Sequence, residues 1–187
     1  MSAGDPARPA APGLAALALP AAFAVAAFAV DRAVKWWVMD VMALPERVAI
    51  DVAPPFLRLV MAWNTGANFG LGSQLAAEVW IGIALAISAA LVVWATRMRS
   101  PWRRVSVGLI VGGALGNALD RAIYGAVADF LNMSCCGIHN PFAFNPADIF
   151  IFAGAAGLIL LDASDSQSGG PPDGPSRKAP SGKAPSR

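Results

Sequence analysis

The sequence predicts an all-α membrane protein with four transmembrane helices and a small extracytoplasmic β-rich segment between helices 1 and 2. Hydrophobic residues make up 56% of the 187 positions and charged residues only 14%, with a mean hydropathy of +0.54. A soluble domain carries about 25% charged residues. Four uncharged apolar runs supply the helices, and a polar stretch with two β-prone runs lies between the first two.

The four apolar runs are residues 14–30, 79–95, 105–119 and 149–161. Each is short against the ~20 residues that span a hydrocarbon core, so each has to include a flanking turn or thin the bilayer locally. A soluble protein with four buried helices is the alternative, but it would need amphipathic partner helices, which the sequence lacks. The first run also resembles a cleavable signal peptide, and cleavage would start the mature chain near Asp31.

The polar stretch between the first two runs contains two β-prone segments. Residues 47–52 alternate in hydropathy, and 56–63 form a second run after the Pro54-Pro55 break. We expect a small sheet on the outer membrane surface. The domain organisation that follows is a disordered N-terminus at 1–13, a membrane domain at 14–161 and a disordered cytoplasmic tail at 162–187, which is rich in Gly, Pro and Ser.

The basic residues predict the orientation. The connector 96–104 holds four arginines and no acidic residue, which places it in the cytoplasm. With four spans, both termini then lie on that side, together with nine of the 14 Lys and Arg residues. The polar ends of the spans face outward.

Composition excludes several kinds of function. A net charge of +2 is too small for a nucleic-acid surface, so no nucleic-acid partner is expected. Two cysteines and one histidine are too few for a disulfide framework or a conventional zinc site, and we expect neither a metal nor a cofactor. Cys135 and Cys136 could form a vicinal disulfide or bind a metal with His139, or could belong to a variable loop.

Polar residues gather at the predicted outer ends of the helices. The candidate site residues are Asp31, Lys35, Asn64, Gly66, Asn117, Asp120, Arg121, Asp129, Asn145 and Asp148. Ionisable residues at membrane depth are costly and by default indicate function. The convergence of four separate polar clusters on one rim therefore predicts a site there.

Each cluster also has a structural interpretation. Asp31 and Lys35 could be an ordinary i,i+4 helix pair, and Asn117 with Asp120 could hold a loop. Asn145 could cap the fourth helix, whose dipole favours an acidic residue in the first turn. Asp129 is harder to explain in this way, because its neighbours are apolar and an unpaired buried carboxylate is expensive.

Two facing carboxylates would have a chemical use. If Asp129 and Asp148 face each other, burial and like-charge repulsion let the pair hold one proton near neutrality. The ionised member can then take a proton from water while the protonated member polarises a carbonyl, as in aspartic proteases. A Ser/His/Asp set is not available, because the chain has one histidine and no G-x-S-x-G turn.

Five motifs resemble those of the lipoprotein signal peptidase (signal peptidase II) family, in the family's order. They are DRAVK from Asp31, NTGANF from Asn64, GGALGNALDR from Gly112, GAVADF from Gly125 and FNPAD from Phe144. The resemblance implies an inner-membrane aspartyl endopeptidase that cuts diacylglyceryl-modified prolipoproteins before the lipidated cysteine. It also implies contact with membrane lipid and inhibition by globomycin-type compounds.

By position in these motifs, Asp129 and Asp148 match the family's catalytic pair, and the other eight candidates match residues that line or support its site. The match at Asp31 and Lys35 argues against cleavage after the first span. Asn68 departs from the family, which usually has alanine there. Two other functions remain as alternatives, a small proton-coupled transporter and a non-enzymatic membrane assembly factor. A transporter would usually place its charges at the midplane and often show inverted repeats.

Overall fold

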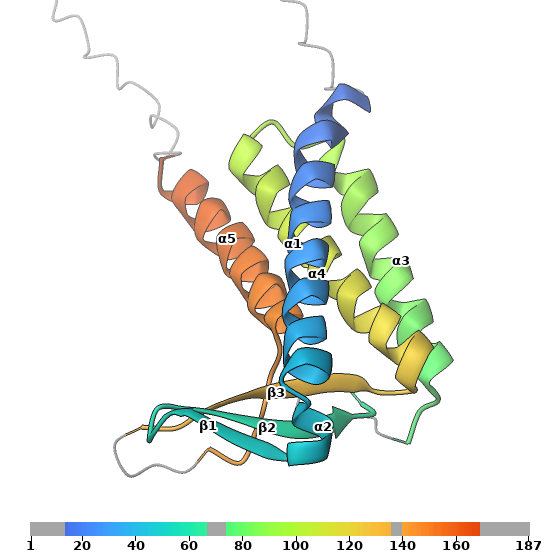
Figure 1. Cartoon of the computed structure of the whole chain (residues 1–187). Helices are drawn as coiled ribbons and strands as arrows, with labels where there is room; N and C mark the ends of the chain where they lie inside the picture. The colour runs from blue at the N-terminus through green and yellow to red at the C-terminus, as the bar shows by residue number, and fades with distance from the viewer. Residues whose placement is uncertain (1–13, 67–73, 136–139, 169–187) are drawn as a thin grey trace, which may run out of the picture.

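Four long helices stand side by side, and a small sheet lies across one end of them (Figure 1). The computed structural model describes residues 14–66, 74–135 and 140–168. The long helices are α1 (Ala18–Trp36), α3 (Ala77–Ala95), α4 (Pro101–Tyr124) and α5 (Pro146–Ser168). Each overlaps one of the four predicted apolar runs, although the first four residues of the first run lie in the 3₁₀ turn that precedes α1.

Two of these helices have both the length and the hydropathy of a membrane span. Within the described residues they are Ala77–Ala95, with a mean hydropathy of 2.0, and Pro146–Ser164, with 1.7. The other two, α1 and α4, carry charged residues near their ends on the side of the sheet.

The helix ends follow capping chemistry more closely than hydropathy. α4 begins at Pro101, four residues before its apolar run, because Ser100 precedes it and its hydroxyl accepts the Arg103 N–H at 3.5 Å. It ends at Tyr124, and the following Gly125 has a φ of +74°, the left-handed conformation that terminates helices. α5 continues to Ser168, seven residues past the predicted limit of the membrane domain at 161.

The central helix, α4, packs against α1, α3 and α5. Its glycines permit close approach on two sides. A Cβ atom on Gly112 would collide with the backbone oxygen of Ala24 in α1, and one on Gly113 would collide with that of Ala147 in α5. Such small-residue contacts hold membrane helices together by close van der Waals packing.

We expect Gly112→Ala to destabilise the protein by about 1–3 kcal/mol, because the added methyl group overpacks the contact between α1 and α4. Gly82→Ala in α3 is the matched control, since its Cβ would meet nothing within 4 Å. It should leave the stability unchanged or raise it by up to about 1 kcal/mol through helix propensity. Thermal unfolding in detergent measures both, and equal effects would contradict the packing argument.

A short irregular stretch joins α1 to the sheet. After α1 come the π-helical turn η2 (Trp37–Val41) and the short helix α2 (Leu44–Arg47). At the other end of α1, the 3₁₀ turn η1 (Leu14–Leu17) precedes it. Beside the sheet, Val38, Leu44, Leu59 and Phe130 form a buried hydrophobic cluster. This cluster fixes the sheet against the lower end of α1.

The sheet is antiparallel with the order β1-β2-β3. β1 (Ala49–Ala53) and β2 (Leu57–Asn64) are the two predicted strands, and β3 (Val127–Met133) is a third. The predicted β-rich segment between the first two long helices is therefore present, and β3, which follows α4, is a third strand that the sequence analysis did not predict. In the β2–β3 register Ala62 pairs with Asp129.

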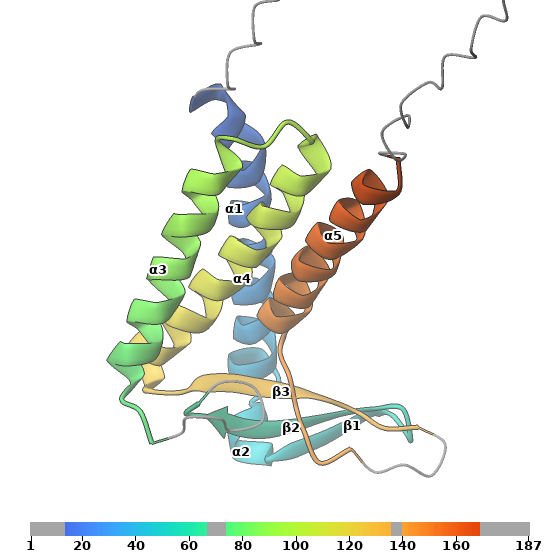
Figure 2. The same ribbon diagram turned by 180° about the vertical axis from the view of Figure 1, so that it is seen from behind.

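The two ends of the helix bundle contain different parts of the chain. The start of α1, the α3–α4 connection and the end of α5 lie together at the end away from the sheet (Figure 2). The opposite end meets the sheet and holds the predicted polar residues that are described. The predicted gathering of these residues at one level is therefore confirmed for the described positions.

Candidate active site

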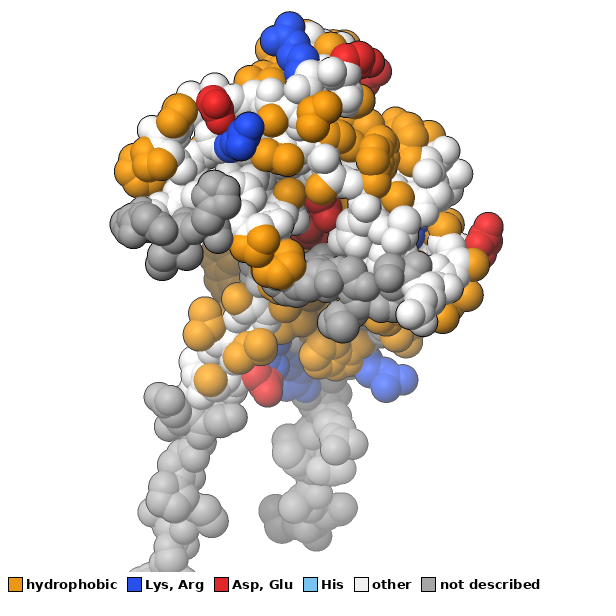
Figure 3. Space-filling model, turned by 90° about the horizontal axis from the view of Figure 1, so that it is seen from below, with side chains coloured by type: hydrophobic (Ala, Val, Ile, Leu, Met, Phe, Trp, Pro, Cys, Tyr) orange, Lys and Arg blue, Asp and Glu red, His pale blue; other side chains and the backbone are white. Residues whose placement is uncertain are grey.

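Two buried aspartates lie where the sheet meets the bundle. Asp129 is in β3 and Asp148 is in the first turn of α5, and each is only 4% exposed. Seen from the sheet side, the face carries scattered hydrophobic side chains, and an acidic side chain lies in a recess near its middle (Figure 3).

Asn145 connects the two aspartates. Its amide nitrogen donates to Asp129 Oδ1 at 2.5 Å, and its side-chain oxygen accepts the backbone N–H of Asp148 at 3.1 Å. The second contact caps α5, whose first residue is Pro146, as is typical of helix starts. Asn145 therefore does what the structural interpretation expected and in addition holds a carboxylate from another element.

Two more asparagines complete the hydrogen bonding. Asn64, at the end of β2, donates to Asp129 Oδ2 at 3.0 Å, and its own oxygen accepts the Gly66 N–H at 3.1 Å. Asn117 in α4 donates to Asp148 Oδ1 at 2.9 Å. Three amides, from β2, from α4 and from the residue before α5, thus direct their donors at the two carboxylates and fix their positions.

Burial raises the pKa of Asp129 from 3.8 to about 6, and the neighbouring charge of Asp148 adds to the shift. The hydrogen bonds from Asn145 and Asn64 and the charge of Lys35 act in the opposite direction, but they are outweighed. Near neutral pH this carboxyl group therefore exchanges a proton readily.

The raised pKa of Asp129 predicts a pH-dependent stability. Since the folded pKa of about 6 exceeds the ordinary value of 3.8, the carboxyl's contribution is fully present below pH 3.8 and is lost as pH rises through 6. The loss is on the order of 3 kcal/mol. Between pH 3.5 and 7.5, thermal midpoints in detergent should fall for the wild type relative to Asp129→Asn. A constant difference between the two proteins would contradict the shift.

A buried ionic cluster lies next to the two aspartates. Lys35 Nζ lies 2.6 Å from Asp120 Oδ2 and 3.1 Å from Asp31 Oδ1. Arg32 bridges the same two carboxylates at 2.8 and 2.6 Å. Asp31 and Asp120 are fully buried and Lys35 is 2% exposed. The i,i+4 pair is thus part of a buried network and not an ordinary surface pair.

This ionic cluster is hydrogen-bonded to the elements that carry the aspartates. Asp31 accepts the N–H of Ala147, which precedes Asp148, at 3.0 Å. Asp120 accepts the N–H of Ala128, which precedes Asp129, at 3.3 Å. Lys35 also donates to the oxygen of Asn117 at 3.3 Å, so the Asn117 nitrogen is directed at Asp148. The cluster therefore positions both carboxylates through the backbone and through Asn117.

Arg121 holds the chain after β2. Its guanidinium donates to the Gly66 carbonyl oxygen at 2.5 Å and to the Asn117 carbonyl oxygen at 3.3 Å. It also lies over the ring of Trp80, 5.8 Å from the centroid. Its Nε is buried and has no hydrogen-bond partner among the described residues. Arg121 thus fixes Gly66, and through the turn that follows β2 it supports Asn64.

The structure brings together all ten predicted site residues. Two participants were missed. Arg32 could have been found, because it stands between Asp31 and Lys35 in the sequence, whereas nothing in the sequence indicates Trp80.

Asn68, Cys136 and His139 lie outside the described residues, and Cys135 is exposed. Among the described residues, no group of three His, Cys, Asp or Glu side chains is placed to hold a metal ion.

Comparisons with known proteins agree with one another. A family model described as signal peptidase (SPase) II matches residues 23–163. The chain is similar to a "Lipoprotein signal peptidase" of Methylobacterium sp. (strain 4-46), at 42% identity over 77% of this chain and 88% of the relative. It is also similar to one of Methylorubrum extorquens (strain PA1), at 43% identity over 73% and 80%.

Solved structures resemble the fold. One, described as a bacterial membrane enzyme, has a TM-score of 0.70 at 27% identity, and the match covers 80% of this chain and 90% of that one. A second with the same description has a TM-score of 0.66 at 26% identity, over 78% and 93%.

Proposed function

Because the chain belongs to the signal peptidase II family, membrane proteases that remove signal peptides from prolipoproteins, we propose that Asp129 and Asp148 perform this cleavage as an aspartic pair. The observation that carries the proposal is their arrangement. Two buried carboxylates from β3 and α5 are held by three asparagine amides, and one of them has a pKa of about 6.

The proposed reaction uses one water molecule and no cofactor. One ionised carboxylate takes a proton from the water, whose oxygen attacks the scissile carbonyl carbon, while the protonated carboxyl polarises the carbonyl oxygen. The proton then passes to the leaving nitrogen. Both oxygens of Asp129 accept amide hydrogen bonds, and Asp148 Oδ1 accepts one from Asn117.

We propose that all four long helices cross the bacterial inner membrane. α3 and α5 have the hydropathy of spans. Most charged side chains near the sheet end of α1 and α4 are paired in the buried ionic cluster. This pairing lowers the free-energy cost of placing them within the membrane. The arginines of the α3–α4 connection lie at the end away from the sheet, so the positive-inside rule places that end and both termini in the cytoplasm.

The sheet end then faces the outside, with aromatic side chains at the interface. Trp36, Trp37, Trp63 and Tyr124 are about half exposed there, and tryptophan and tyrosine are enriched at membrane interfaces. In this arrangement residues 14–161 form the peptidase domain.

We propose diacylglyceryl-modified prolipoproteins as the substrates, cut just before the lipidated cysteine. The transmembrane signal helix enters sideways from the bilayer, and the sheet limits access of water to the scissile bond. The pair of aspartates then lies at the outer end of the signal helix, where the cleavage site is. Globomycin-type compounds are the expected inhibitors. No contact described above favours transport or a purely structural role.

The test is cleavage of a diacylglyceryl-modified prolipoprotein by the purified protein in detergent. Mass spectrometry of the products should place the cut at the peptide bond before the modified cysteine, and globomycin should block it. Equal cleavage of the unmodified precursor would contradict the proposed substrate class, and cleavage elsewhere would contradict the proposed specificity.

A further inference from the structure

An apolar groove of about 730 Å³ opens directly beside Asp148. One wall is the segment before α5 and the other is the first two turns of α5. The lining residues are Asn140, Phe142, Ala143, Phe144, Asp148, Ile149, Phe152 and Ala153. Asp148 is therefore both one of the two proposed catalytic carboxylates and part of the groove wall.

The wall formed by residues 140–144 is hydrogen-bonded to β3 of the sheet. The Phe144 carbonyl accepts the N–H groups of Phe130 and Leu131 at 3.0 and 2.8 Å, and the Phe144 N–H donates to the Leu131 carbonyl at 3.1 Å. The amide of Asn132 donates to the carbonyl oxygens of Asn140 and Phe142 at 2.8 and 2.9 Å. With the other wall fixed by the Asn145 cap, the groove is preformed.

The groove suits a hydrocarbon occupant. Phe142, Ile149 and Phe152 are 46%, 48% and 59% exposed, so their apolar surfaces line an opening on the flank of α5. None of the described residues that line the groove is a lysine or an arginine, which disfavours a phosphate group. Its volume is within the range of pockets that enclose small molecules.

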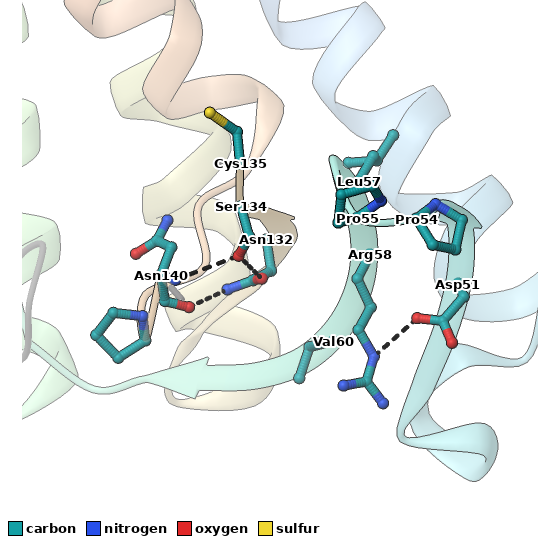
Figure 4. Close-up of a pocket in the computed structure, with 11 residues that line it drawn as sticks. Asp51, Pro54, Pro55, Leu57, Arg58, Val60, Asn132, Ser134, Cys135 and Asn140 are labelled. Carbon is teal, nitrogen blue, oxygen red and sulfur yellow. Dashed lines mark hydrogen bonds and ion pairs between the residues drawn. The ribbon is translucent and has the colours of Figure 1, made fainter. Parts of the chain in front are cut away.

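A second pocket has a different chemistry. It has a volume of about 510 Å³ and lies on the sheet near Asp51, Arg58, Asn132 and Ser134 (Figure 4). Its lining includes the charged side chains of Asp51 and Arg58, and it includes neither Asp129 nor Asp148. Of the two, only the apolar groove reaches a carboxylate of the proposed pair.

We infer that the groove between residues 140–144 and α5 holds the acyl chains of the substrate's lipidated cysteine next to the scissile bond. The inference rests on the proposed function. The cysteine sulfur lies three bonds from the nitrogen of the bond to be cut, so a scissile bond at Asp148 brings the glycerol and the start of its chains to the mouth of the groove. The chains then leave along α5 into the bilayer.

The first test is kinetic and uses a substitution that makes the groove narrower. Ala153→Leu adds bulk inside it, and Ala163→Leu makes the same change on an exposed site near the far end of α5. We expect Ala153→Leu to raise KM at least about tenfold for a long-chain diacylglyceryl substrate, with little change in kcat. A short-chain substrate should change less than about twofold, because each buried methylene changes affinity roughly fourfold. Ala163→Leu should match the wild type.

Phe152→Ala is the second variant, should Ala153→Leu fold poorly. It removes wall surface and should weaken the dependence of KM on chain length. If long and short chains were affected equally by both variants, the groove would hold the signal helix instead, and the inference would be wrong.

Photocrosslinking separates this inference from the proposed function. A diacylglyceryl peptide with a photoreactive group in its acyl chain should label residues 142–153 in the wild-type protein, whether or not the peptide is cut. If no prolipoprotein is cleaved, the proposed function fails. The labelled positions still show, independently of cleavage, whether the acyl chains bind in the groove. Labelling confined to α1 or α3 would overturn the inference even with normal cleavage.

Discussion

Asp129→Asn and Asp148→Asn should each lower kcat for prolipoprotein cleavage by roughly 10³-fold or more, because each removes a group that transfers a proton in the transition state. Asparagine preserves the shape of the side chain but cannot take a proton from water or share one with the remaining aspartate. Single-turnover cleavage of a diacylglyceryl prolipoprotein measures the loss.

Asp40→Asn is the control for these variants, since Asp40 is an exposed aspartate at the same end of the bundle. It should cleave at the wild-type rate. Thermal midpoints should show that all three variants remain folded. Cleavage above about a tenth of the wild-type rate by either site variant would remove that residue from the proposed mechanism.

Lys35→Met should cost about 3–5 kcal/mol of stability, because it leaves buried carboxylates without one of their two cations. Asn117 also loses the donor that orients its amide toward Asp148. Thermal unfolding in detergent and cleavage assays on the folded fraction measure the two consequences. We expect kcat to fall further than the lost folded fraction accounts for.

Arg58→Met is the matched control. Arg58 also pairs with an aspartate, at 3.1 Å, but the two side chains are 52% and 62% exposed. Exposed ion pairs contribute about 0–1 kcal/mol, so this variant should unfold close to the wild-type temperature. Similar losses in the two variants would show that burial of the Lys35 cluster contributes little.

Hydropathy predicted the helices well and their ends less well. The apolar runs identify α1, α3, α4 and α5, since membrane-scale apolar length is a strong signal. The start of α4 at Pro101 depends on the cap at Ser100, and the extension of α5 to Ser168 passes through Asp162, where the apolar run has ended. Capping and helix propensity, which hydropathy does not measure, set these boundaries.

The third strand was missed because its pattern is not that of a half-exposed strand. Residues 127–130 are all buried, so no alternation marks them. Asp129, in their middle, is also unusual in a strand core. Its conformation is fixed by pairing with β2, more than sixty residues away, and a local pattern does not show such pairing.

The site was largely predictable as a set of residues, because costly polar groups recur beside apolar runs. Their roles were less predictable. That Asp120 belongs to the ionic cluster with Lys35, while Asn145 joins the two aspartates, depends on three-dimensional contacts between α1, α4, α5 and β3.

The most direct test of the central claim compares the two single Asp→Asn variants with the double variant. If Asp129 and Asp148 act as one unit on one water molecule, the double variant should cleave no more than about tenfold slower than the weaker single variant, because either loss alone disables the pair. The test needs four single-turnover rates on one diacylglyceryl prolipoprotein, those of the wild type, the two single variants and the double variant. Losses that multiply would contradict a shared mechanism and indicate that the two carboxylates act independently.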